Sequence, residues 1–391
     1  MRLDDRSQAM QAAAQECAAE LRAVALAVDR DPAQNRLVAA SPAVRALQRL
    51  GLPPDEDAGP GMDEAPERGL RCIDTVVAVI ELAAGDASVM LSVPGAALAG
   101  MVVGLMGDDD QRRYFNSRIR DGQTWTFCAI TEPEVGSDAA RMTTALTAER
   151  AGGYRLNGVK RYVGNGSRGA IGVVFARTGP SPLAIRAAIV EADRTGFNAS
   201  PLDMVGLRGA RLSEMRFTDV PVDEHMLLGS HRSSVQRGIW GAVQAFNNMR
   251  VLVGAMALGT AIAVHEYVRG ERRWPSRWEA AHLDAYAAEI EWVRALHYQA
   301  AVSLDANVNN GHAAALAKLE GVRLARRATT RLPALLGPGA LLEHPLLEKW
   351  WRDGFGFEFM EGTGNIQRLT LAQGFLKGKF THHAAQLAST V

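Results

Sequence analysis

The sequence has few of the features that mark secreted, membrane-spanning or nucleic-acid-binding proteins. Only three of its 391 residues are cysteines, Cys17, Cys72 and Cys128, and their spacing matches no metal site. Any disulfide would leave one of them over, so a reduced, cytoplasmic setting is expected. Lys+Arg and Asp+Glu both number 43, which gives a formal net charge of zero. The charge balance therefore provides no general attraction to nucleic acid or to an anionic membrane.

Signal segments, long apolar spans and nucleotide-binding loops are also missing. The first residues, Met1–Arg6, include acids and lack the basic-then-apolar order of a signal peptide. The weakly polar stretch from Thr75 to Met106 is interrupted by charged residues, glycine and proline, so we expect buried helices and no membrane span. No Gly-x-Gly-x-x-Gly follows a predicted strand, which argues against a doubly wound nucleotide-binding fold.

Along the sequence, the residue pattern changes from helical to strand-like and then back to helical. Apolar residues recur at intervals of three and four from residue 7 to about 124. From there to about Leu228, short β-branched runs alternate with glycine- and proline-containing turns, which is typical of an antiparallel sandwich or barrel. Long amphipathic segments follow, as in an antiparallel bundle. The prediction is an α+β protein with an N-terminal all-α domain (1–124), a middle antiparallel β-sandwich or barrel domain (125–230) and a C-terminal four-helix bundle domain (231–391).

The expected elements are defined by residue ranges, and the proline-rich segment Gly51–Pro66 is expected to be a loop. The predicted strands are Trp125–Ile130, Thr143–Glu149, Tyr154–Val159, Gly172–Ala176, Ala187–Glu191 and Glu214–Val220. The predicted helices are 7–28, 68–84, 87–120, 236–270, 276–308, 310–332, 343–351 and 364–377.

Four motifs, in this order along the chain, resemble those of the acyl-CoA dehydrogenase family. They are a helix ending in Asp86-Ala87-Ser88, then Thr131-Glu132-Pro133 followed by Gly136-Ser137-Asp138, then Leu156–Lys160 with Gly206–Gly209, and finally Arg352-Asp353 with Glu361–Arg368. The resemblance implies FAD as cofactor and α,β-dehydrogenation of an acyl thioester. It also implies a homo-oligomer, a dimer or a tetramer, and an electron acceptor such as an electron-transfer flavoprotein.

The resemblance assigns Glu361 as the base that removes the α-proton. A carboxylate shielded from water is a stronger base than one in water, and the neighbouring Phe355, Phe357, Phe359 and Met360 suggest an apolar flank. Local sequence alone favours a solvated loop acid before a helix capped by Thr363, and the motifs together favour the base. Some members of the family place the base on a bundle helix, but the matching stretch Phe246–Arg250 contains no carboxylate. Arg250 matches an arginine near the base, or else lies on the helix surface.

The resemblance also assigns the flavin-contacting residues. Ile130 and Thr131 match contacts to the flavin pyrimidine, and Ser137 matches a contact to the FAD pyrophosphate or nearby substrate groups, although each of Thr131 and Ser137 also suits an ordinary turn. Tyr162 stands where the family usually has tryptophan beside the flavin ring, and Gly164 stands where it has a hydroxyl residue that bonds flavin N5. Thr363 and Asn365, at a helix start, match contacts to the adenosine half of FAD.

Three departures from the family pattern bear on cofactor and substrate. Around Arg272 and Arg273 the usual Arg-x-x-Phe-Gly is incomplete, although Arg272 or Arg273 still suits the pyrophosphate. Pro333–Ala340 replaces the usual Gly-Gly-x-Gly run, and Asp55–Pro66 lacks Glu-x-Gly-Gly-x-Gly. We therefore expect a specialised dehydrogenase of acyl-CoA or of an acyl-carrier-protein thioester. The alternatives are an acyl-CoA oxidase or flavin monooxygenase on the same fold, or a non-catalytic binding protein derived from it.

Overall fold

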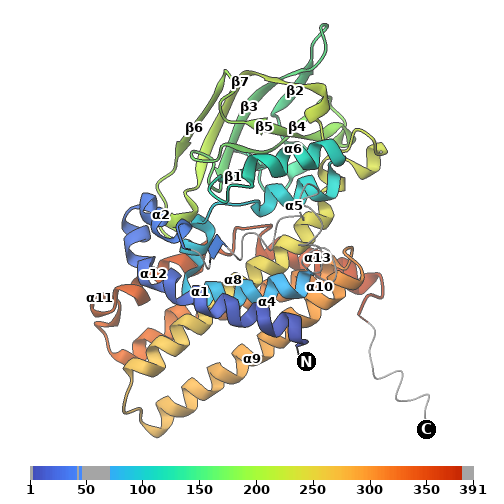
Figure 1. Cartoon of the computed structure of the whole chain (residues 1–391). Helices are drawn as coiled ribbons and strands as arrows, with labels where there is room; N and C mark the ends of the chain where they lie inside the picture. Colours follow the sequence, from blue (N-terminus) through green and yellow to red (C-terminus); the bar gives the residue numbers. More distant parts are fainter. Residues whose placement is uncertain (1–2, 42–43, 46–70, 381–391) are drawn as a thin grey trace, which may run out of the picture.

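The computed structural model describes residues 3–41, 44–45 and 71–380, so the predicted loop Gly51–Pro66 and the departure at Asp55–Pro66 lie outside the described residues. Helices form one half of the molecule and a β domain forms the other (Figure 1). The elements follow one another as helices, then strands, then helices. This arrangement confirms the α+β class and the order predicted from sequence texture.

The N-terminal helices differ from the prediction mainly in where they break. Helix α1 spans Asp5–Arg30 and packs on α4, Cys72–Ser92, which is kinked at Asp86 (φ −166°, ψ 118°). Gly85 is required beside the kink, because a Cβ there would lie 2.4 Å from the carbonyl oxygen of Ala18. The predicted helix 87–120 is interrupted twice, since Pro94 breaks it and Asp108 begins a new capping box. The two later pieces are α5, Ala97–Met106, and α6, Asp109–Ile119.

The β domain is one curled sheet of seven strands in the order β1-β4-β2-β3-β7-β6, with β5 paired to β4. Most neighbours are antiparallel, as expected, but β1 runs parallel to β4 with Thr126 opposite Ile171. The edge strand β6 was not predicted, because its sequence, Phe-Asn-Ala-Ser-Pro, is short, largely polar and ends in proline. The strands are β1 Thr126–Ala129, β2 Ala145–Ala148, β3 Tyr154–Val163, β4 Ile171–Arg177, β5 Ile185–Glu191, β6 Phe197–Pro201 and β7 Ser213–Val222.

The C-terminal half is a bundle built around α8. Helices α4 and α8 are long and apolar enough to cross a membrane by length and composition, but 61% and 89% of their most apolar windows are buried inside the protein. Both therefore serve as core helices here. The bundle elements are α7 Gly238–Gly241, α8 Val243–Glu271, α9 Arg277–Ala306, α10 Gly311–Arg331, α11 Ala340–Glu343, α12 Pro345–Gly356 and α13 Gly364–Leu376.

A buried ionic cluster joins the N-terminal helices to the bundle. The ammonium of Lys349 lies 2.7 Å from the carboxylate of Asp86 and 2.6 Å from that of Asp353, and all three side chains are almost fully buried. Asp353 also accepts a hydrogen bond of 2.5 Å from the N–H of Leu207. Leu207 has a left-handed backbone (φ +50°), which is uncommon for a residue with a side chain. The cluster thus ties α4, α12 and the loop before β7 together.

Candidate active site

Glu361 lies in the turn between α12 and α13, in a strained backbone conformation. Its φ is +51°, and the following Gly362 has φ +91°. A left-handed conformation is uncommon for a residue with a Cβ, and such strain persists only where the surrounding structure enforces it. No described residue accepts a hydrogen bond from the N–H of Glu361. The turn therefore presents both a carboxylate and an unused backbone donor.

Lys318, from the middle of α10, fixes the position of this turn through hydrogen bonds from its ammonium group. The side chain is almost fully buried, and its ammonium donates hydrogen bonds to the carbonyl oxygens of Met360 and Gly362. Burial lowers the pKa of Lys318 to about 8, although the nearby acids Glu358 and Glu361 oppose this shift. The sequence analysis did not identify this residue. A lysine within an Ala- and Leu-rich helical stretch was its only signal.

Two further contacts complete the turn. The amide of Gln367 donates to the carbonyl oxygens of Glu361 at 3.1 Å and Gly362 at 2.9 Å. The carboxylate of Glu358 accepts a hydrogen bond of 2.8 Å from the N–H of Gly364, the first residue of α13. The carbonyl oxygens of the turn thus point toward the protein interior, which leaves the Glu361 N–H free for another acceptor.

The side chain of Glu361 is partly buried and lies in a cationic environment. Burial raises its pKa, while the positive charges of Lys318 and Arg250 act in the opposite direction. The pKa of the Cys128 thiol, on β1, is raised by burial and by the charge of Glu361, so this strand of the β domain also borders the site. The apolar flank predicted from the neighbouring phenylalanines is wrong in part, because Phe359 is 75% exposed. The groups that interact electrostatically with the carboxylate come from α8, α10 and β1.

Arg250, on α8, is placed beside Glu361 as the sequence analysis proposed. Its guanidinium donates a hydrogen bond of 2.9 Å to the side-chain oxygen of Asn247, and Asn247 in turn donates to the carbonyl of Val308 at 3.0 Å. Burial lowers the pKa of Arg250, and the charge of Glu361 opposes that shift. The Nε of Arg250 is buried with no hydrogen-bond partner in the described residues. The guanidinium therefore retains a free donor near the carboxylate.

A second buried lysine fixes the turn after β1. Lys160, on β3, lies 3.0 Å from Glu132 and donates to the carbonyl oxygen of Ile130 at 2.8 Å. Glu132 also accepts from the N–H groups of Thr143 (2.7 Å) and Thr144 (2.8 Å). Burial lowers the pKa of Lys160 to about 8 against the pull of Glu132. The pKa of Glu132 falls to about 2 despite its burial, because Lys160 and the threonine hydrogen bonds favour the carboxylate.

The predicted flavin-facing residues of the β domain lie just after β1 and at the end of β3. Ile130 and Thr131 follow β1, and the carbonyl oxygen of Thr131 accepts a hydrogen bond of 2.8 Å from the N–H of Arg161. Tyr162 has φ +61° and its side chain is 54% exposed, so this aromatic ring offers an open face. At Gly164 an added Cβ would meet only the Leu212 side chain, at 4.0 Å.

The remaining predicted residues are spread more widely. Thr363 is the N-cap of α13 but makes no side-chain capping bond, and the exposed Asn365 accepts a hydrogen bond of 3.0 Å from Arg368. Ser137 is exposed in the loop after β1. Arg272 ends α8 and pairs with Glu279 at 2.8 Å, about 33 Å along the helix from Arg250 at 1.5 Å per residue. Within one chain, Arg272 is therefore remote from Glu361.

Comparisons with known proteins agree with this geometry. Residues 128–220 match the family model "Acyl-CoA dehydrogenase, middle domain", and residues 236–376 match "Acyl-CoA dehydrogenase, C-terminal domain". The acryloyl-CoA reductase (NADH) of Anaerotignum propionicum is 30% identical over 288 residues, which cover 69% of this chain and 71% of that protein. The chain belongs to the acyl-CoA dehydrogenase family. The resemblance seen in the four sequence motifs is thereby confirmed, and related members are oxidoreductases that act on CH–CH bonds.

Solved structures of acyl-CoA dehydrogenase relatives share the whole fold. A glutaryl-CoA dehydrogenase from Mycobacterium smegmatis in complex with FADH2 has a TM-score of 0.81 and 21% identity, with 97% of each chain covered. A prolyl acyl carrier protein oxidase has a TM-score of 0.80 and 21% identity, covering 96% of this chain and 100% of that one. At these identities the likeness establishes the fold, and the former structure shows that a family neighbour binds the flavin.

Proposed function

We propose that this protein is an FAD-dependent dehydrogenase that introduces a double bond between Cα and Cβ of an acyl thioester, with Glu361 as the base. The observation that carries the proposal is the partly buried carboxylate of Glu361, which lies on a strained turn and interacts with the positive charges of Lys318 and Arg250. A raised pKa makes this carboxylate a better acceptor for the weakly acidic proton next to a thioester carbonyl.

The backbone of the same turn suits the second requirement of the reaction. Removal of the α-proton places negative charge on the thioester oxygen, which a preorganised N–H donor stabilises. The N–H of Glu361 has no acceptor among the described residues, and its turn is fixed through Lys318 and Gln367. Arg250, with its unpartnered Nε, adds a positive charge beside the carboxylate. We assign Arg250 to orienting the thioester and the ionised base.

The residues of the β domain fit a planar cofactor. The exposed ring of Tyr162 offers a stacking face, and the turn at Ile130 and Thr131 is held rigidly by Lys160. In this proposal Ile130, Thr131, Tyr162 and Gly164 face the flavin. When bound, FAD supplies the acceptor for the hydride that leaves Cβ. The site residues assigned to the other parts of FAD are Ser137, Thr363, Asn365 and, from a neighbouring subunit, Arg272.

Substrate and surroundings are proposed on further grounds. The thioester is carried by CoA or by an acyl carrier protein in a specialised biosynthetic pathway, supported by the altered Pro333–Ala340 region and by the shared fold of a carrier-protein oxidase. An electron-transfer flavoprotein serves as electron acceptor, as the family resemblance implies. The three cysteines are free thiols, which supports a cytoplasmic location. We retain the domain division 1–124, 125–230 and 231–391 as a proposal.

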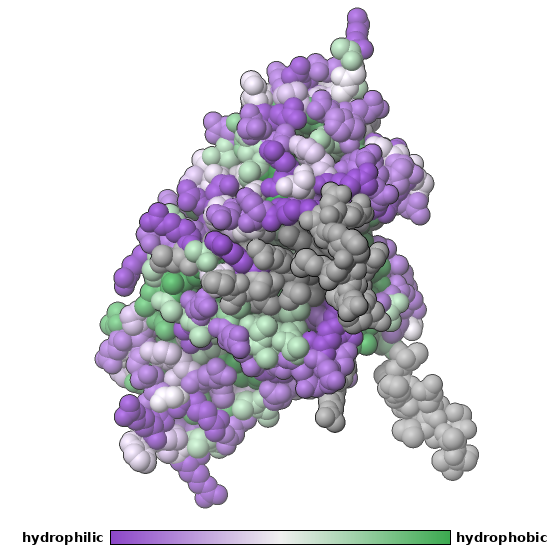
Figure 2. All heavy atoms as spheres, in the orientation of Figure 1, coloured by the Kyte–Doolittle hydropathy of each residue, from purple (hydrophilic) through white to green (hydrophobic). Residues whose placement is uncertain are grey.

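Exposed apolar side chains support a homo-oligomer, a dimer or a tetramer. Figure 2 shows hydrophobic residues on the surface of the helical half. Helix α13 exposes Leu369, Phe375 and Leu376 at 59%, 64% and 84%, and Phe359 is exposed just before it. Trp278 and Trp292, on α9, are 67% and 52% exposed. Several large apolar side chains exposed along bundle helices are more typical of a subunit interface than of a free surface.

The proposal is tested by anaerobic titration of the FAD-loaded protein with a panel of acyl-CoA and acyl-carrier-protein thioesters, following the flavin absorbance. Glu361→Gln should still bind the thioester but lose about 10²–10⁴-fold in the rate of flavin reduction. Glu358→Gln is the matched control, because it removes a nearby acid of the same turn without touching the proposed base. If Glu361→Gln reduces the flavin at the wild-type rate, the assignment is wrong. Rapid reoxidation by O2 with release of peroxide would identify an oxidase instead.

A further inference from the structure

Two arginines meet in the interior beside the β domain, outside the Glu361 site. Arg186 is the second residue of β5 and is only 8% exposed, and Arg237 directly precedes α7. The residues next to them in the chain touch, because a Cβ at Gly238 would lie 1.7 Å from the carbonyl oxygen of Ile185. The pKa of Arg186 is lowered by burial and by the positive charge of Arg237. The two guanidinium groups therefore repel each other within the protein.

The described residues do not neutralise this pair. One terminal nitrogen of Arg186 donates to the hydroxyl of Ser230 at 2.9 Å and to the carbonyl of Leu228 at 3.4 Å. The Nε atoms of both arginines are buried without a hydrogen-bond partner in the part of the chain that the structure describes. No salt bridge joins either arginine to a carboxylate of the described residues, and the phenol of Tyr154 only partly opposes the lowering of the Arg186 pKa.

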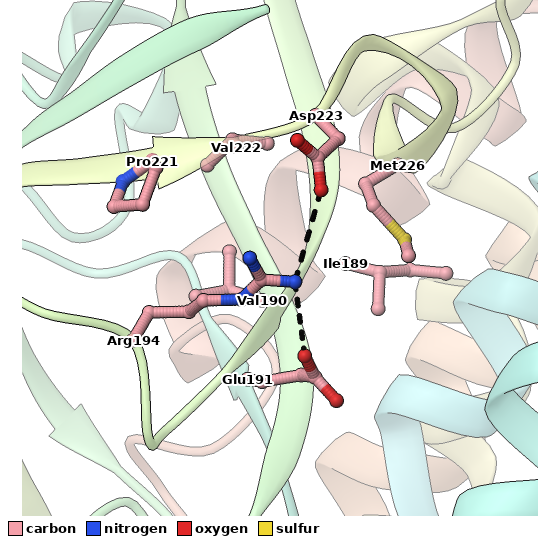
Figure 3. A pocket seen from close by; sticks show the side chains of 8 residues that line it. All are labelled: Ile189, Val190, Glu191, Arg194, Pro221, Val222, Asp223 and Met226. Atoms are coloured by element: carbon pink, nitrogen blue, oxygen red, sulfur yellow. Dashed lines mark hydrogen bonds and ion pairs between the residues drawn. The ribbon is translucent and has the colours of Figure 1, made fainter.

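Arg194, just after the same strand, differs from this pair because carboxylates balance its charge. Its guanidinium bridges Glu191 at 3.1 Å and Asp223 at 3.7 Å, at a small surface pocket (Figure 3). The contrast matters because a buried charge without a counter-charge is costly to the fold. An anion placed against Arg186 and Arg237 would remove that cost. Guanidinium groups are suited to phosphate oxygens, which accept paired N–H donors.

The spacing between Arg237 and Arg250, which interacts with Glu361, fits one class of anion. Ala242 between α7 and α8 has helical backbone angles (φ −82°, ψ −6°), so the chain from Gly238 to Glu271 runs on as nearly one helix. Arg237 precedes Arg250 by 13 residues, or about 20 Å at the rise of an α-helix. An extended pantetheine arm has about as many backbone bonds as four to five residues of extended chain, which gives roughly 15 Å between its sulfur and its phosphate. The side chains of Arg186 and Arg237 cover the remaining distance between the phosphate and the protein backbone.

We propose that Arg186 and Arg237 bind the phosphate ester at the end of the pantetheine arm of the thioester substrate. This inference rests on the proposed function, because it places the thioester at Glu361. The phosphate belongs either to CoA or to the prosthetic group of a carrier protein, and both present the same phosphate ester to the pair. The site selects for a phosphorylated arm and plays no part in proton removal.

The test compares two small thioesters, acyl-phosphopantetheine and acyl-pantetheine, in binding to the FAD-loaded protein. The wild type should bind the phosphorylated form about ten- to a hundred-fold more tightly, the range expected for hydrogen bonds to a charged group. Arg237→Gln and Arg186→Gln should each reduce that ratio toward one while the affinity for acyl-pantetheine stays unchanged. Arg237→Lys should restore part of the ratio, and Arg194→Gln, the matched control on an ion-paired arginine, should leave it as it is.

Two results would overturn the proposal, and further measurements identify the source of the phosphate and separate this proposal from the proposed function. Equal weakening of both thioesters in the variants would overturn the proposal, as would an unchanged ratio in Arg237→Gln, which sits at a half-buried position and is expected to fold. Repeating the measurement with acyl-CoA and with an acyl carrier protein identifies the source, since the arginine variants should weaken binding of the true carrier. Glu361→Gln should keep the full phosphate preference. The loss of flavin reduction and the loss of phosphate preference therefore report on separate proposals.

Discussion

Lys318→Met offers a direct test of how the Glu361 turn is held. Methionine keeps most of the volume of the buried stem but cannot donate to the carbonyl oxygens of Met360 and Gly362. An unsatisfied buried carbonyl costs about 1–3 kcal/mol, and the ammonium's own desolvation cost disappears at the same time. Gly362 keeps its hydrogen bond from Gln367, so only the Met360 carbonyl is left without a donor, and we expect a net loss of about 1–2 kcal/mol in stability. Thermal unfolding of the FAD-loaded protein measures it.

The same substitution should change the pH dependence of activity in a defined direction. Burial raises the pKa of Glu361, and the charge of Lys318 limits that rise, so removing the charge should raise the pKa further. The base is active only when ionised, and the acidic limb of kcat/KM should therefore move to higher pH in Lys318→Met. A displaced turn should also lower kcat by about 10²-fold. The exposed Lys377 provides the control, Lys377→Met. A Lys318→Met protein with wild-type stability and an unmoved acidic limb would refute this reasoning.

Two other substitutions probe the β-domain side of the site. Gly164→Thr should fold, because an added Cβ meets only Leu212 at 4.0 Å, and it should shift the absorbance spectrum and reduction potential of bound FAD; failure to fold would show that the space is needed. Glu132→Gln should destabilise the protein by about 3–5 kcal/mol near neutral pH, because it leaves Lys160 buried without its partner. Glu149 forms an exposed ion pair with Arg155, and Glu149→Gln should lower the stability by less than about 1 kcal/mol. Because the folded-state pKa of Glu132 is lowered to about 2, its stabilisation is present above the ordinary value of 4.5 and is lost as the pH falls toward 2. Acid unfolding curves of Glu132→Gln should lack that drop, and an identical curve for both proteins would contradict the role given to the pair.

Periodicity and turn chemistry predicted the architecture well, because they depend on residues close together in the sequence. Helices α9 and α10 begin within one residue of their predicted starts at 276 and 310. The errors occur where tertiary packing decides. The edge strand β6 carries a weak local signal, and it is a strand because β7 offers it a partner, whereas the break before α5 was missed although Pro94 marks it. The parallel pairing of β1 with β4 is likewise a long-range choice.

The site residues also divide into those that the sequence signals and those that only tertiary packing brings together. Glu361 and Arg250 were assigned from their motifs' resemblance to a known family, and their charges interact in the structure. The Arg186–Arg237 pair could not be foreseen, since nothing local indicates that β5 and the segment before α7 touch. The apolar flank inferred for Glu361 is wrong in part for the related reason that nearby residues in a turn point in different directions. Phe357 is fully buried, whereas Phe359 is exposed.

Three buried lysines explain why these turns hold their shape. Lys160, Lys318 and Lys349 are each at most 1% exposed, although lysine is among the residues least often buried. Lys160 fixes the turn of Ile130, Lys318 fixes the turn of Glu361, and Lys349 acts through Asp353 on the loop of Leu207. Each one connects an element of regular structure to a turn that either faces the proposed site or has a strained backbone. A charge with several donors can satisfy carbonyl or carboxylate oxygens from two segments at once, which an apolar side chain cannot do. These three lysines, which residue type alone would place at the surface, thus fix the turns of the proposed site and the strained loop of Leu207.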